Sequence, residues 1–269
     1  MKGKINKLRW KWEALIANPQ NSKLRIRDAA QILKVSEAEL LSTKINRGVT
    51  YLVINNWYDF FQDICSIGKL MFLVRNEYAV HEIIENNYTV SRIENELLEI
   101  KSKNTNTLLD VSKISFVFYE SIMSRGKNLY NFQLFDANGD SIIKIYLKND
   151  DISGFKKIQK IFETEYNFEL QNIEPKRESI NLQPTEKTIT NVNSSIYTNY
   201  IKNINYKMNK KYDFNVLKKI LDNTVDAQCD ITIGVTNKHA IQLFKGQIIK
   251  VKYIYNWLNI LDGQFNLHC

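Results

Sequence analysis

The 269-residue sequence has few of the residues that cross-link or interrupt a chain, with three cysteines, three prolines and nine glycines. Cys65, Cys229 and Cys269 lie far apart and form no CxxC pair, which argues against a disulfide framework or a structural zinc site. We expect three reduced thiols. The sequence contains no run of about 18 apolar residues, so it predicts no membrane-spanning helix.

Familiar catalytic motifs are also missing from the sequence. It contains no GxGxxG, GxxxxGK[ST], GxSxG or HExxH, so the common nucleotide, hydrolase and metalloprotease functions have no support. No two of the three histidines, His81, His239 and His268, have the spacing of metal ligands. His81 lies in RNEYAVHE at residues 75–82, an extended pattern in which a single imidazole is typical of a packed residue. We therefore assign no catalytic residue.

Acidic residues are scarce at the start of the chain, where most of the net charge of +8 is concentrated. Residues 1–50 contain eleven Lys or Arg against four Asp or Glu, and six lysines with one aspartate lie between Lys202 and Lys219. These patterns favour anionic partners or a solvated basic face. No apolar segment follows the first charges, so we predict no secretory signal and a cytoplasmic protein.

Apolar spacing predicts helices over much of the first 68 residues. SEAE at 36–39 is typical of a helix start in which Ser36 and Glu39 cap each other's backbone amides. Another helix is predicted from Tyr51 to Ile67. The basic helix pair at 26–41 also suits a DNA-binding helix-turn-helix, although the acidic start of its second helix would repel phosphates.

From residue 69 the pattern changes to strands. Asn138-Gly139 predicts a tight hairpin turn between 129 and 147, and a helix is predicted at 153–165. Residues 171–195 contain two prolines and no aromatic residue, and we interpret them as a linker. Helices at 196–206 and 214–222 then lead into further strands.

A shift of 161 residues places VRNEYAVH at 74–81 over VTNKHAIQ at 235–242, which indicates an internal duplication. The hairpin at 129–147 would recur near position 300, beyond Cys269. The sequence therefore predicts an α+β fold with two repeats of antiparallel sheet and flanking helices, the second repeat incomplete. We place the first repeat at 1–170, with a helical start at 1–68 and sheet and helix at 69–170, and the partial second repeat at 196–269.

The sequence resembles the bacterial haemin-degrading, HemS-like family. The resemblance is carried by the following segments in this order: RWKWEALIANP, RDAAQILKVSEAELL, RNEYAVHE, FQLFDANGDSIIKIYLKNDD, HAIQLFKGQIIKV and WLNILDGQFNLH. It implies two structural repeats that hold haem between them, in a longer chain than this one. On that basis this chain resembles a C-terminally truncated member.

The resemblance also implies an axial histidine after the linker and an arginine facing it across the porphyrin. Our alignment puts Ser195 and Leu108 at these two positions, and neither residue can replace the expected one. Tyr197 and Tyr200 lie one helical turn apart, and a phenolate can bind ferric haem, so Tyr197 is the candidate iron ligand. Both tyrosines also fit simple packing. Lys202 and Lys207 are candidate partners for the haem propionates.

The function implied by the resemblance is cytoplasmic haem trafficking or oxidative haem degradation with release of iron. The mismatches at Ser195 and Leu108 leave open whether the chain is an enzyme, a haem carrier or an inactive relative. The implied partners are haem and a haem donor or a separate haem oxygenase. A homodimer is one arrangement that would supply strands missing from the second repeat. DNA binding through residues 26–41 is the alternative function.

Overall fold

The structure is a computed structural model that describes residues 2–94, 96–124, 126–163, 214–254 and 257–269. It begins with α1 (Lys2–Ala17), a 3-10 turn η1 (Pro19–Asn21), α2 (Ile26–Leu33) and α3 (Glu37–Ser42). The predicted capping of α3 is confirmed, because Ser36 Oγ accepts a hydrogen bond from the Glu39 amide at 3.1 Å and Glu39 Oε2 accepts one from the Ser36 amide at 2.8 Å.

The predicted helix at 51–67 starts later than its apolar pattern suggested. The chain first forms strand β1 (Val49–Leu52), and α4 runs only from Trp57 to Cys65. Asn56 Oδ1 accepts hydrogen bonds from the amides of Tyr58 and Asp59, so this side chain fixes the helix start.

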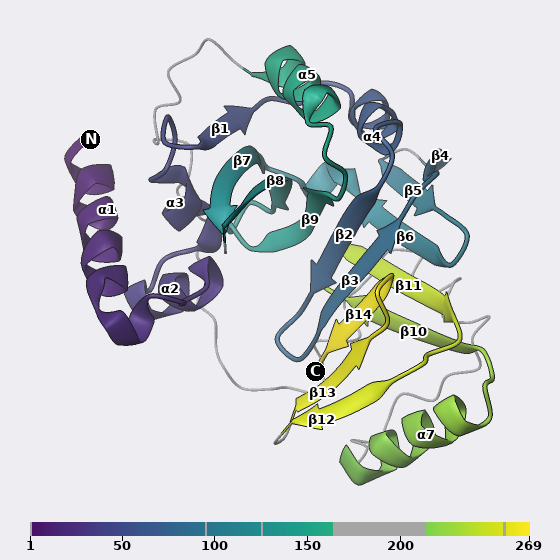
Figure 1. Cartoon of the computed structure of the whole chain (residues 1–269). Coiled ribbons are helices and arrows are strands. Elements are labelled where there is room, and N and C mark those ends of the chain that lie inside the picture. The colour runs from purple at the N-terminus through teal and green to yellow at the C-terminus, as the bar shows by residue number, and fades with distance from the viewer. Residues whose placement is uncertain (1, 95, 125, 164–213, 255–256) are drawn as a thin grey trace.

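Nine antiparallel strands form the larger sheet, in the order β1-β7-β8-β9-β2-β3-β14-β13-β12 (Figure 1). The strands not yet located are β2 (Leu70–Arg75), β3 (Val80–Glu85), β7 (Phe116–Ser124), β8 (Lys127–Phe135), β9 (Ser141–Leu147), β12 (Val251–Ile254), β13 (Trp257–Leu261) and β14 (Phe265–His268). Of the predicted Asn138-Gly139 pair in the β8–β9 turn, Gly139 alone takes a positive φ, +78°.

Five antiparallel strands form the smaller sheet, in the order β10-β11-β6-β5-β4. They are β10 (Ile231–Thr236), β11 (Ala240–Gly246), β6 (Thr105–Asp110), β5 (Leu97–Lys101) and β4 (Thr89–Glu94), and a 3-10 turn η2 (Val111–Lys113) follows β6. The remaining described helices are α5 (Ser153–Phe162) and α7 (Phe214–Asp226), which lie at the two predicted helices 153–165 and 214–222. The predicted linker at 171–195 and helix at 196–206 lie outside the described residues.

The internal duplication is confirmed by the topology. The shift of 161 residues carries β2, Leu70–Arg75, onto β10, Ile231–Thr236. β3 pairs with β14, where Val80 stands opposite His268, and its counterpart β11 pairs with β6, where Ile241, the equivalent of Val80, stands opposite Leu108. Each sheet is therefore built from strands of both repeats. Within the described residues, the second repeat has no counterparts of β7, β8 and β9.

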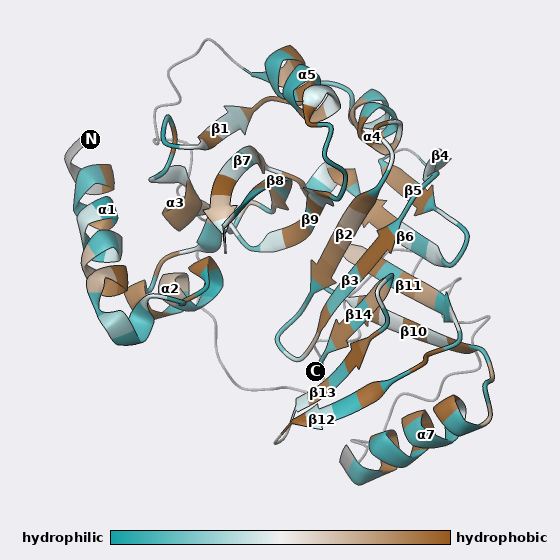
Figure 2. Ribbon diagram, viewed as in Figure 1, coloured by the Kyte–Doolittle hydropathy of each residue, from teal (hydrophilic) through white to brown (hydrophobic). Residues whose placement is uncertain are grey.

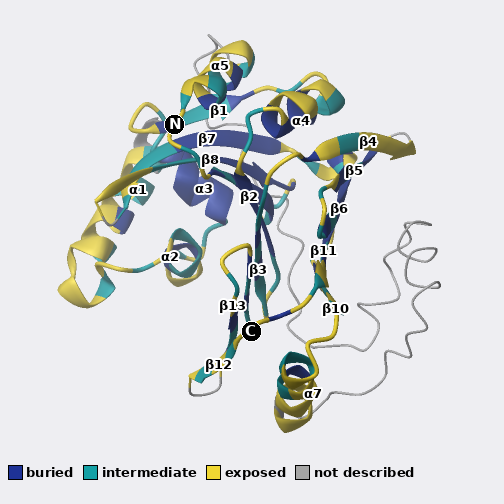
Figure 3. Cartoon of the chain, turned by 45° about the vertical axis from the view of Figure 1, so that its right-hand side comes forward, coloured by how far each residue is buried: buried dark blue, intermediate teal, exposed yellow. Residues whose placement is uncertain are grey.

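The main core lies between the two sheets and beneath α4 and α5. Its buried residues come from both sheets and include Phe72, Ile83, Leu109, Phe244 and Phe265. The hydrophobic residues concentrate along the strands in Figure 2, and the central strands of the nine-stranded sheet are buried in Figure 3. The confirmed fold class is α+β, with two antiparallel sheets that share one core.

Candidate functional site

The first candidate surface is the face of the five-stranded sheet that points away from the nine-stranded sheet, which we call the outer face. Side chains alternate between the two faces of a strand. Leu109 packs into the main core between the sheets, so its neighbour Leu108 lies on the outer face. In the register of the sheet Leu108 stands opposite Ile241 on β11 and Glu99 on β5.

The centre of the outer face is apolar and shielded from water. Leu97, Leu108 and Ile241 expose only 8%, 3% and 7% of their surface, yet none of them belongs to the core between the sheets. Glu99 lies beside them. Its carboxylate accepts a hydrogen bond from Asn106 Nδ2 at 2.9 Å and forms an ion pair with Lys101 at 2.7 Å. The outer face thus combines an apolar patch with a polar margin.

Leu108 occupies the position where the resemblance implies an arginine. Its side chain can pack against the flat apolar surface of a porphyrin, but it can donate no hydrogen bond to an iron-bound ligand. The described part of this face is therefore apolar and lacks a polar group at that position. Ser195, Tyr197, Tyr200, Lys202 and Lys207 lie outside the described residues, so their roles stay predictions.

The histidines supply no obvious metal site. His81 is completely buried between the sheets, with its ring edge-on to Phe265, and burial lowers the pKa of its imidazole to about 3. His268 Nδ1 lies 2.6 Å from Asn259 Oδ1, and His239 pairs with Asp136 at 3.4 Å. Among the described residues, no three His, Cys, Asp or Glu side chains are grouped as metal ligands. The prediction that His81 is a packed residue is consistent with this environment.

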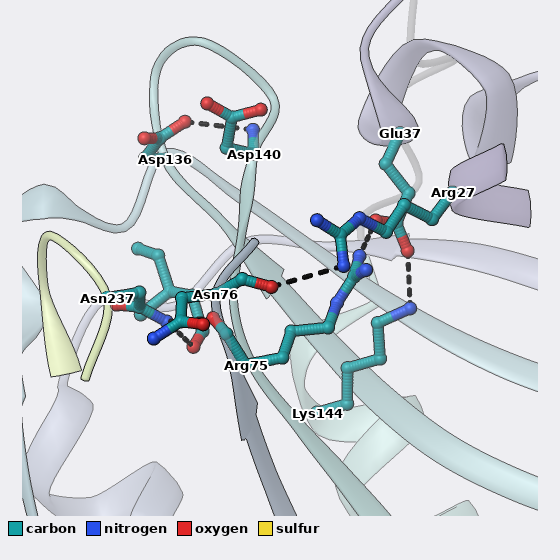
Figure 4. Close-up of polar contacts among 9 residues, drawn as sticks. Arg27, Glu37, Arg75, Asn76, Asp136, Asp140, Lys144 and Asn237 are labelled. Atoms are coloured by element: carbon teal, nitrogen blue, oxygen red, sulfur yellow. Dashed lines mark hydrogen bonds and ion pairs between the residues drawn. The ribbon is translucent and has the colours of Figure 1, made fainter. Parts of the chain in front are cut away.

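A second group of polar residues joins the two repeats, and Figure 4 shows them. Asn76 Nδ2 donates to the Thr236 carbonyl at 3.0 Å, and Asn237 Nδ2 donates to the Arg75 carbonyl at 3.4 Å. These contacts are reciprocal, because the shift of 161 residues relates Arg75 to Thr236 and Asn76 to Asn237. Each Asn Oδ1 also accepts hydrogen bonds from two backbone amides of its own turn. The matching RN and TN pairs thus mark the junction of the repeats.

Glu37 anchors the N-terminal helices to this junction. Its carboxylate forms ion pairs with Arg75 and Lys144, the latter at 2.5 Å, and Arg27 donates to the Asn76 carbonyl at 3.2 Å. Burial alone would raise the pKa of Glu37, but Lys144 and Arg75 together hold it below its ordinary value. Sequence reasoning missed this cluster. The available signal was a charged residue within each of the apolar strand patterns LMFLVR and IIKIYL.

The β8–β9 turn carries a smaller pair at the same junction. Burial tends to raise the pKa of Asp136, but a hydrogen bond with His239 and the amides of Asp140 and Asn138 lower it below its ordinary value. The carboxylates of Glu37 and Asp136 are therefore both matched by cations or donors. We interpret the junction as structural because Glu37 and Asp136 form their ion pairs with other residues of the junction.

The structure also decides against the DNA-binding helix pair at 26–41. Every residue of α3, from Glu37 to Ser42, is buried, so this helix offers no surface to a DNA groove. A hollow of about 540 Å³ elsewhere, between the turns before β6 and β14, is lined by Lys103, Lys245, Asp230 and Asp262. Its mixed charges do not suit the apolar face of a porphyrin. No described helix is long and apolar enough to cross a membrane.

Comparisons with known proteins agree with the duplicated fold. Residues 34–163 match the haemin-degrading HemS.ChuX domain. The hemin transport protein HmuS of Yersinia pestis is 24% identical over 268 residues, which cover 90% of this chain and 75% of HmuS. The hemin transport protein HemS of Yersinia enterocolitica is also 24% identical, over 94% of this chain and 79% of HemS. None of these matches supports DNA binding.

Solved structures show the same fold. Holo-PhuS, a heme-binding protein from Pseudomonas aeruginosa, aligns with a TM-score of 0.81 and 21% identity over 98% of this chain and 82% of PhuS. The heme degrading enzyme ChuS from Escherichia coli O157:H7 aligns with a TM-score of 0.78 and 22% identity, over 97% of this chain and 81% of ChuS. The chain therefore shares the fold of PhuS and ChuS, and its residues 34–163 are similar to the haemin-degrading HemS.ChuX domain.

Proposed function

We propose that this protein binds haemin as cargo in the cytoplasm and hands it to another protein. The observation that carries the proposal is the match of residues 34–163 to the haemin-degrading domain, since that segment includes β5 and β6 with Leu97 and Leu108. The names of HmuS, HemS and PhuS support haemin as the ligand. A haem donor and an oxygenase that receives haem are the proposed partners, with a homodimer as the proposed assembly.

The outer face of the five-stranded sheet is the proposed contact surface for the porphyrin. Leu97, Leu108 and Ile241 would pack against the ring and keep water from it, which favours binding in proportion to the apolar area covered. Tyr197 is the proposed iron ligand, Tyr200 its neighbour on the helix predicted at 196–206, and Lys202 and Lys207 are the proposed propionate partners. We propose haemin as cargo and not as a substrate, because Leu108 stands where the resemblance implies an arginine and can donate no hydrogen bond to an iron-bound ligand.

Titration of the protein with haemin, followed by the Soret absorbance, tests this function. We expect saturable binding that weakens about tenfold or more in Leu108→Glu, because a carboxylate would be buried against the porphyrin. Leu261→Glu is the control for the added carboxylate alone, since Leu261 lies on the other sheet and is 40% exposed. Leu108→Met, which keeps an apolar side chain, should bind like the unchanged protein.

Two further outcomes separate the parts of the proposal. Ascorbate and oxygen should leave the bound haemin intact, and formation of a bile pigment would contradict the carrier function. Tyr197→Phe should remove the charge-transfer absorption of an iron-bound tyrosinate. The absence of any Soret change in the unchanged protein would overturn haemin binding itself.

A further inference from the structure

A hollow of about 240 Å³ in the first repeat lies between α1, the turn that joins α3 to β1, and the C-terminal half of β7. Its lining combines apolar side chains with charged ones, and the charged members are Arg9, Glu13, Lys44, Arg47 and Glu120. None of these residues belongs to the proposed haemin surface on the five-stranded sheet, so the hollow is a separate place on the molecule.

Lys44 presents an amine that is largely shielded from water. Its side chain is 30% exposed, and its Nζ lies 4.4 Å from the centre of the Trp12 ring and 3.9 Å from Glu120 Oε1, which is too long for a hydrogen bond. Burial lowers the pKa of this amine below its ordinary value, although Glu120 acts in the opposite direction. At neutral pH Lys44 therefore contains more of the neutral, nucleophilic amine than an exposed lysine does.

Glu120 is held so that one of its oxygens faces this amine. Its Oε2 accepts hydrogen bonds from Asn131 Nδ2 at 3.1 Å and from Gln133 Nε2 at 2.7 Å, and the residue is only 7% exposed. The other oxygen, Oε1, forms the ion pair with Lys44. A fixed carboxylate beside an amine can accept a proton from it and return the proton during a reaction.

The arginines of the hollow favour a small ligand with an anionic group. Arg47 pairs with Glu13 at 3.3 Å, whereas Arg9 uses its Nε to donate to the Thr43 carbonyl at 2.8 Å. A guanidinium has five N–H donors, so Arg9 keeps others for a carboxylate or a phosphate. Pockets for drug-sized ligands begin at about 300 Å³, so this hollow suits a smaller molecule.

We propose that Lys44 captures a small aldehyde that carries a carboxylate or a phosphate, and binds it as an imine. The neutral amine attacks the carbonyl carbon, a C–N bond forms, and the carbonyl oxygen leaves as water with the two hydrogens of the amine. Glu120 Oε1 relays the proton from the nitrogen to the departing oxygen, and Arg9 holds the anionic group. The reaction consumes no oxidant and no reductant.

Pyridoxal phosphate is the probe, because it is an aldehyde with a phosphate and its imines absorb visible light. The unchanged protein is incubated with a limiting amount of it at neutral pH, the imine is reduced with borohydride, and peptide mass spectrometry locates the label. Lys44 should carry about tenfold more label than Lys11, an exposed lysine of α1, because the hollow orients the aldehyde. This excess should shrink as the pH approaches about 10.4, where exposed lysines also lose their protons.

Variants and a second aldehyde complete the test. Lys44→Arg keeps the positive charge and removes the nucleophile, so the imine absorbance should fall to that of the exposed lysines, whereas Lys11→Arg should leave it unchanged. Pyridoxal, which lacks the phosphate, should give a lower ratio of label on Lys44 to label on Lys11. Equal labelling of the two lysines at neutral pH would overturn the imine site, and equal ratios for the two aldehydes would overturn the preference for an anionic group.

Discussion

Glu37 illustrates how a buried charge is retained in this protein. Only 6% of its surface is exposed, and Arg75 and Lys144 together compensate its charge. The three residues come from α3, β2 and β9, so the cluster ties a helix to two strands far apart in the sequence. Removal of the shared carboxylate would leave two cations in a poorly hydrated site.

We therefore expect Glu37→Gln to lower the free energy of unfolding by about 3–5 kcal/mol, as is usual when one partner of a buried ion pair is lost. Urea denaturation monitored by circular dichroism measures the change. Glu13→Gln is the control, because Glu13 pairs with Arg47 on the surface, where such a change usually costs about 1 kcal/mol or less. Equal effects of the two substitutions would contradict the account of the buried cluster.

The burial of His81 leads us to expect that the fold loses stability in acid. The unfolded imidazole takes up a proton below its ordinary pKa of 6.5, whereas the buried ring stays neutral down to a pKa of about 3. Stability should therefore fall as the pH drops from 6.5 towards 3, by up to about 1.4 kcal/mol per pH unit. The lowered pKa of Glu37 adds a further loss below its ordinary value of 4.5.

The variant His81→Phe isolates the histidine contribution, since an aromatic ring can still pack against Phe265. Denaturant unfolding of this variant between pH 6.5 and 4.5 should show a flatter dependence on pH than the unchanged protein. An unchanged slope would mean that the imidazole is protonated in the fold.

At the scale of the element, hairpin turns explain both the success and the limits of sequence prediction. The alternation and the Asn138-Gly139 pair predicted the β8–β9 hairpin, because such turn chemistry is local. The same approach merged β1 with α4, since the side chain of Asn56 decides where that helix begins. It could not show that the β8–β9 turn packs on the start of α3, which depends on residues about 100 positions apart.

This packing makes Gly139 more critical than other turn glycines. A Cβ at Gly139 would lie 2.3 Å from Ser36 Oγ and 2.6 Å from Ser36 Cβ, whereas one at Gly126 would meet nothing within 4 Å. Both glycines have similar positive φ angles, +78° and +76°, so they share the same backbone strain on substitution.

Thermal denaturation should consequently show Gly139→Ala to be less stable than Gly126→Ala, by about 1–3 kcal/mol for the added overlap. The shared strain, of order 1 kcal/mol, cancels in the comparison. Equal stability of the two variants would show that α3 does not rest on this turn.

At the scale of the whole molecule, the duplication organises the fold. The repeat of residues 74–81 at 235–242 was visible in the sequence, and the structure gives the two copies matching contacts through Asn76 and Asn237. The exchange of β6 and β14 between the repeats was not visible, because it depends on pairing between distant segments rather than on local pattern. For the same reason the sequence could mark Leu108 as a mismatch without revealing its place on the outer face.

The central claim is that haemin binds to the outer face of the five-stranded sheet. Methyl NMR of the protein with ferric haemin tests it most directly, with diamagnetic gallium protoporphyrin as the matched control. We predict that the paramagnetic iron broadens the methyl signals of Leu97, Leu108 and Ile241 and leaves that of Leu261, on the other sheet, sharp. Broadening centred on Leu261, or on no methyl of the five-stranded sheet, would contradict the account.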